Sequence, residues 1–256
     1  MPAARVALHV LTRLPFALSG ASIAGWLLFA FLGKALPMSA FCLSADGGSE
    51  TARRLELAFT FNPPTALLLA WSAMLLAMMP PLLGPPLLHV WYRSLTRRRV
   101  RAIGLFVLGY AFVWLAAGSL LAAGSLVLGS IGPAVDLPPL AIAALIAATW
   151  QAAPLKQTSL NRCHSRPPLA AFGFRAEADA LRYGADHAVW CVGACWALML
   201  LPLAANGLLH WTMMAAVTLM SVVERARVPS AARWGAAWPR LPRPSRASPI
   251  PMRTTA

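Results

Sequence analysis

The chain has 256 residues, of which 59% are hydrophobic and 12% are charged, and its formal net charge is +14. A soluble domain has about 45–50% apolar and about 25% charged residues, so the composition excludes that class. Nucleic acid is also excluded as a partner, because the arginines lie between apolar segments and near the C-terminus without forming a basic face. We therefore expect a polytopic membrane protein whose surroundings are membrane lipids.

Six apolar segments predict an all-α bundle of six transmembrane helices. The first run is longer than the core of a signal peptide, so we interpret it as an uncleaved helix. The bundle occupies residues 1–228, and residues 229–256, rich in Pro, Arg, Ser and Ala, are expected to form a disordered basic C-terminal tail. The predicted spans are about 16–36, 65–91, 103–131, 138–155, 187–204 and 208–223.

Three local features modify this plan. The proline pairs at 80–81 and 85–86 should kink or break the second span, because they remove backbone donors. The third span contains many Gly, Ala and Ser residues, such as Gly109 and Gly118, which allow helices to pack closely. A hydrophilic loop is expected from 156 to 186, carrying Cys163 and His164.

The distribution of basic residues predicts the orientation. Lys and Arg number two before the first span, five between spans two and three, five between spans four and five, and seven after span six. The connections between spans one and two, three and four, and five and six carry very few Lys or Arg residues. The positive-inside rule therefore places both termini in the cytoplasm and indicates the bacterial inner membrane.

The fifth span carries His187, Cys191, Cys195 and Met199, spaced four residues apart. This spacing places all four side chains on one helix face. Imidazole, thiol and thioether groups suit copper(I), while zinc is possible if the methionine is left out.

The rise per residue places part of the second span at the depth of Met199. The candidate metal ligands are therefore His187, Cys191, Cys195, Met199, Met78, Met79, Met74 and Cys163. An alternative stays open, because cysteine and methionine are also ordinary packing residues in apolar helices. Lys156 and Glu224 fall near the same boundary, where they form either a charge pair between spans or part of a functional site.

Three motifs and a closing Glu224 extend over residues 60–228. The first is Trp71, Met74, Ala77, Met78 and Met79 followed by proline. The second is Trp150-Gln151 with Pro154-Leu155-Lys156 and Cys163. The third comprises Gly184, His187, Cys191, Gly193, Cys195, Trp196, Leu198 and Met199. This arrangement resembles the predicted metal-binding integral membrane proteins catalogued as domain of unknown function 2182. Ser159 stands where many members have a cysteine.

The resemblance implies metal binding and a part in copper handling. We expect a protein without enzymatic activity that binds copper(I) as a chaperone, a transporter or an assembly factor. Its partner would be a copper enzyme or another copper-accepting protein. Two alternatives remain open: a membrane-embedded redox protein or enzyme that uses the same thiols, and a structural subunit that binds no metal.

Overall fold

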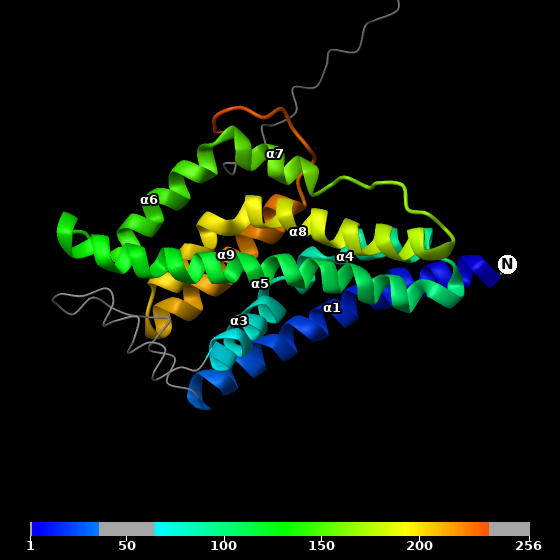
Figure 1. Cartoon of the computed structure of the whole chain (residues 1–256), viewed down its shortest axis with the longest axis horizontal. Helices are drawn as coiled ribbons and strands as arrows, with labels where there is room; N and C mark the ends of the chain where they lie inside the picture. The colour runs from blue at the N-terminus through cyan, green and yellow to red at the C-terminus, as the bar shows by residue number, and fades with distance from the viewer. Residues whose placement is uncertain (1, 36–63, 236–256) are drawn as a thin grey trace, which may run out of the picture.

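The computed structural model describes residues 2–35 and 64–235, and all regular elements in these ranges are helical. The all-α prediction is therefore confirmed (Figure 1). The α-helices are α1 (Pro2–Ala35), α3 (Pro64–Met78), α4 (Gly84–Arg93), α5 (Arg99–Ile131), α6 (Pro139–Ala152), α7 (Pro154–Arg162), α8 (Gly173–Ala204) and α9 (Gly207–Arg225). Short 3-10 turns lie at η2 (Pro80–Leu82), η3 (Thr96–Arg98) and η4 (Gly132–Val135).

Within the described ranges, four helices are long and apolar enough to cross a membrane: Phe16–Gly33, Thr96–Gly129, Gly173–Ala204 and Gly207–Arg225. Two shorter apolar helices, Thr65–Met78 and Pro139–Ala152, fall within the second and fourth predicted spans. A helix of that size extends roughly 20 Å, less than the hydrocarbon core of about 30 Å. The six-span count and the orientation stay predictions.

The second apolar segment is broken as its prolines predict. α3 ends at Met78, Pro80 begins the turn η2, and α4 starts at Gly84. Proline is tolerated in the first turn of a helix, where its missing N–H would have no partner, and Pro85 and Pro86 occupy such positions. The break leaves Met78 and Met79 at a helix end.

The long helices α5 and α8 pack against each other along much of their length (Figure 1). Glycines make this close approach possible. A Cβ atom at Gly109 would collide with the carbonyl oxygen of Leu181, and one at Gly184 would collide with that of Phe106. Gly118 similarly leaves room for the indole of Trp71. The predicted role of small residues in the third span is confirmed at Gly109 and Gly118.

The hydrophilic loop predicted from 156 to 186 is wrong over most of its length. Residues 154–162 form α7, and α8 starts at Gly173. Hydropathy detects only the apolar part of a helix, whereas α8 extends beyond it and exposes Arg182 and Asp186. Glu177, on the same extension, pairs with Arg101 of α5 at 2.9 Å and joins this part of α8 to α5.

The predicted C-terminal tail lies outside the described residues from 236 onward. Its first residues lie against α6 and α7. The side-chain amide of Asn161 donates to the Ser230 carbonyl at 2.7 Å, and the Gly235 amide donates to the Ala152 carbonyl at 2.8 Å.

Candidate metal centre

One face of α8 presents the four side chains that the sequence spacing predicts. His187, Cys191, Cys195 and Met199 are all buried, with exposed fractions of 3%, 0%, 2% and 1%. Alanine and leucine are the most frequent residues of α8 as a whole, and they are among the strongest helix formers. The helix is continuous through the motif, so the four-residue spacing becomes a buried stripe.

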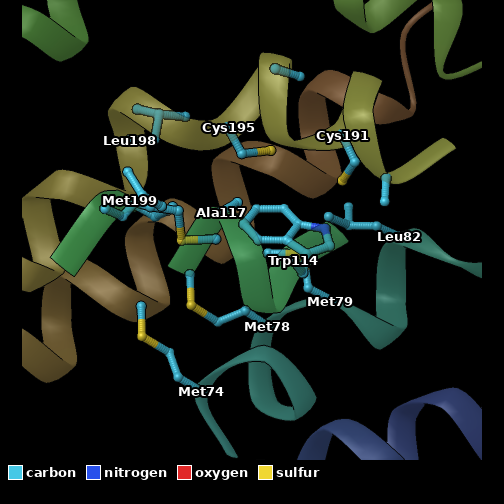
Figure 2. Close-up of a cluster of buried hydrophobic side chains, with 14 of the residues drawn as sticks. Met74, Met78, Met79, Leu82, Trp114, Ala117, Cys191, Cys195, Leu198 and Met199 are labelled. Carbon is cyan, nitrogen blue, oxygen red and sulfur yellow. The ribbon is translucent and has the colours of Figure 1, made fainter. Parts of the chain in front are cut away.

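The three methionines of the second apolar segment are also buried, with exposed fractions of 3% for Met74, 1% for Met78 and 3% for Met79. Figure 2 shows Met74 and Met78 extending toward Met199, within the core cluster that also contains Cys191 and Cys195. The structure therefore brings together the two groups of sulfur-bearing side chains that the depth argument matched. Trp114 and Ala117 of α5 lie in the same cluster.

Cys191 makes the most contacts among the buried thiols. Its Sγ lies 3.3 Å from the hydroxyl of Tyr110 and accepts a hydrogen bond from Arg225 Nη2 at 3.2 Å. Cys195 follows one turn later on the same face of α8, and its Sγ lies 3.9 Å from Ser221 Oγ. In the described part of the chain the cysteines are free, so both sulfurs are available to a metal.

His187 lies one turn before Cys191 on α8. Its Nε2 is 3.5 Å from Arg225 Nη1. The rings of Phe106, Tyr110 and Tyr183 surround the imidazole, with centroids 6.0 to 6.2 Å from it. These aromatic side chains hold the ring in place and leave Nε2 directed at the guanidinium.

Cys163 lies at the C-terminal end of α7 and is buried, with 6% of its surface exposed. Burial raises the pKa of the Cys163 thiol to about 12, although the positive charge of Arg225 acts in the opposite direction. At neutral pH this thiol therefore keeps its proton, and a metal would have to displace it. His164 has its ring nitrogens near the carbonyls of Leu160 and Arg225, at 2.9 and 3.1 Å.

Lys156 and Glu224 form the ion pair that their positions suggested, with Nζ and Oε2 2.8 Å apart. Lys156 belongs to α7, and Glu224 lies near the end of α9. The side-chain amide of Gln151 donates to Glu224, and its oxygen accepts from Lys156. These polar contacts connect α6, α7 and α9 in a region that is almost closed to solvent.

Arg225 is the residue of this region that sequence reasoning missed. Located directly after Glu224, it resembles one of the basic residues that follow a transmembrane span. Its contacts with His187 and Cys191, and its place near Cys163, depend on the packing of α7, α8 and α9. No sequence spacing relates Arg225 to the other three positions.

Among the described residues, no three His, Cys, Asp or Glu side chains already form a group that could hold a metal ion. The candidate site therefore consists of the buried thiols and thioethers of the core cluster, with His187 and Arg225 beside Cys191 at one end.

The family model for PpoB2, described as a copper chaperone, matches residues 68–238. The chain belongs to this copper chaperone family. The match covers all eight candidate ligands, and it confirms the copper-related part of the sequence prediction, whereas it does not extend to zinc or to an oxidation state. No curated protein and no solved structure matched the chain.

Proposed function

We propose that this member of the copper chaperone family is itself a copper chaperone, a multi-pass protein of the bacterial inner membrane that carries Cu(I) on Cys191 and Cys195. The observation that carries the proposal is the pair of adjoining, buried, free thiols beside a buried methionine cluster. The copper ion is the cargo, and a copper-accepting protein is its destination.

The chemistry of the two thiols suits Cu(I). Side chains four residues apart on a helix have Cβ atoms about 5–6 Å apart, so one ion can bridge Cys191 and Cys195. Thiolate and thioether ligands select Cu(I), whereas carboxylates and carbonyls suit harder ions. Each thiol releases its proton when it binds, so affinity rises with pH.

The methionines extend the site beyond the cysteines. Met199, Met74, Met78 and Met79 offer neutral thioether sulfurs within an apolar core. A neutral thioether holds Cu(I) less strongly than a thiolate, which favours onward movement of the ion. We infer that the methionines are the part of the site through which the ion is received or released.

The membrane location is supported by four helices with sufficient length and hydropathy and by the basic residues of alternate connections. Reporter fusions after residue 235 and within residues 36–63 test it. We expect cytoplasmic activity from the first fusion and periplasmic activity from the second. The opposite pattern would overturn the orientation.

A competition titration with a chromogenic Cu(I) chelator tests the copper site. The purified double variant Cys191→Ser, Cys195→Ser should bind Cu(I) at least roughly 100-fold more weakly, because even groups that only support metal ligands contribute 10- to 100-fold. Ala194→Ser is the control, since it adds a hydroxyl to the same buried helix and removes no sulfur. Unchanged affinity and stoichiometry in the double variant would contradict the proposal.

A further inference from the structure

The guanidinium of Arg225 contacts two candidate metal ligands directly and lies near a third. Nη2 donates to Cys191 Sγ at 3.2 Å, and Nη1 lies 3.5 Å from His187 Nε2. The Cys163 thiol lies near enough to the same guanidinium to be affected by its positive charge. The three donors come from the end of α7 and from α8, while the arginine comes from the end of α9.

The contacted atoms are those that would bind a metal. A guanidinium has donors only, so it interacts with the lone pairs of sulfur and of the unprotonated imidazole nitrogen. The neighbouring Glu224 is engaged by Lys156 and Gln151 instead. Arg225 thus places a permanent positive charge beside the Cys191 thiol and the His187 imidazole.

We propose that Arg225 is a displaceable plug, which occupies the place of a cation between Cys163, His187 and Cys191 and withdraws when Cu(I) takes these donors. This inference rests on the proposed function. It accounts for the finding that, in the described part of the chain, these three donors do not form a metal-holding group. It adds His187 and Cys163 to the loaded site.

Withdrawal is structurally feasible. Arg225 is the final residue of α9, and its side chain is only partly buried. Ala226 and the residues after it leave the helix, so the guanidinium can turn outward without disturbing the packed turns before it. Cu(I) can bind only to those molecules in which the Arg225 side chain has withdrawn. The apparent affinity for Cu(I) is therefore the affinity of the open site multiplied by the fraction of molecules that are open. A lower affinity helps a chaperone to give up its cargo.

A competing arrangement has the opposite consequence. If Arg225 stayed in place as a counter-ion for bound thiolates, its removal would weaken Cu(I) binding. The two arrangements therefore predict changes of opposite sign in the same measurement.

The test is the chelator competition titration on full-length protein. Arg225→Gln should bind Cu(I) about tenfold more tightly than wild type, the change expected when an open population near 10% becomes dominant. Arg182→Gln, which removes an exposed arginine from α8, should leave the affinity unchanged. Equal or weaker binding by Arg225→Gln overturns the plug.

Added guanidinium provides a second measurement. In Arg225→Ala, millimolar guanidinium chloride should weaken Cu(I) binding toward the wild-type value, because the free ion can re-enter the vacated place. The same concentration of sodium chloride should have little effect. Equal responses to the two salts would also count against the plug.

X-ray absorption of the Cu(I)-loaded wild type requires no variant to fold. The plug predicts one nitrogen ligand, which disappears in His187→Gln, together with sulfur ligands. A sulfur-only site in the wild type overturns the inference while leaving the proposed function intact. If the wild type binds no Cu(I), the proposed function itself fails.

Discussion

Lys156 of α7 and Glu224 of α9 face each other across 2.8 Å, with 0% and 3% of their side chains exposed. Breaking a buried pair by removing one partner leaves an unpaired charge, which costs about 3–5 kcal/mol. We expect Lys156→Met or Glu224→Leu to lower the free energy of unfolding by about that amount. The double variant should lose markedly less free energy of unfolding than the two single variants lose together. Thermal or denaturant unfolding in detergent gives all four values, and additive losses would show that the pair is not coupled.

Cys163 should be slow to alkylate. Because burial raises the pKa of this thiol to about 12, the reactive thiolate is scarce near neutral pH. The rate should still rise about tenfold per unit between about pH 7 and 9, whereas an unperturbed thiol with a pKa of about 8.5 begins to level off. Mass spectrometry of the Cys163 peptide measures the rate, and the detergent-denatured protein is the control. Levelling below pH 9 in the folded protein would contradict this.

The glycine at 184 should be intolerant of any side chain. A Cβ atom there collides with the backbone of Phe106, so Gly184→Ala should destabilise the protein by about 1–3 kcal/mol through separation of α5 and α8. Gly124→Ala is the matched control, since no described atom outside its own helix backbone and chain neighbours lies within 4 Å of the added carbon. It should be neutral or stabilise by up to about 1 kcal/mol through helix propensity. The midpoint of thermal unfolding distinguishes the two.

Met78 and Met79 should matter for copper more than for stability. Replacing both by leucine conserves volume and should cost less than about 1.5 kcal/mol per site. Loss of two thioethers should nevertheless speed Cu(I) transfer to the chelator, or weaken binding, by about tenfold, equivalent to 1.4 kcal/mol. Met213→Leu is the control, because this methionine of α9 lies outside the buried cluster. Identical transfer kinetics in both variants would assign Met78 and Met79 to packing alone.

The helical class could be predicted because long apolar runs leave few alternatives once the backbone must satisfy its own hydrogen bonds. The break after Met78 could be predicted equally well, since proline removes a backbone N–H donor wherever it occurs. The extent of α7 and the start of α8 could not be predicted from the sequence. Their helices carry charged residues, and charge at a span boundary does not distinguish a solvated loop from a helix that continues into water.

The sequence by itself determined the stripe from His187 to Met199, because a four-residue spacing and a helical period are local properties of one segment. It also indicated that a second sulfur-bearing segment lies at a similar depth. Only the tertiary structure decided that Arg225 contacts His187 and Cys191 and lies near Cys163. It also decided that Lys156 pairs with Glu224 beside Gln151. Such contacts between helices depend on the rotation of each helix about its axis. Close packing at Gly109 and Gly184 sets that rotation, and no single segment encodes it.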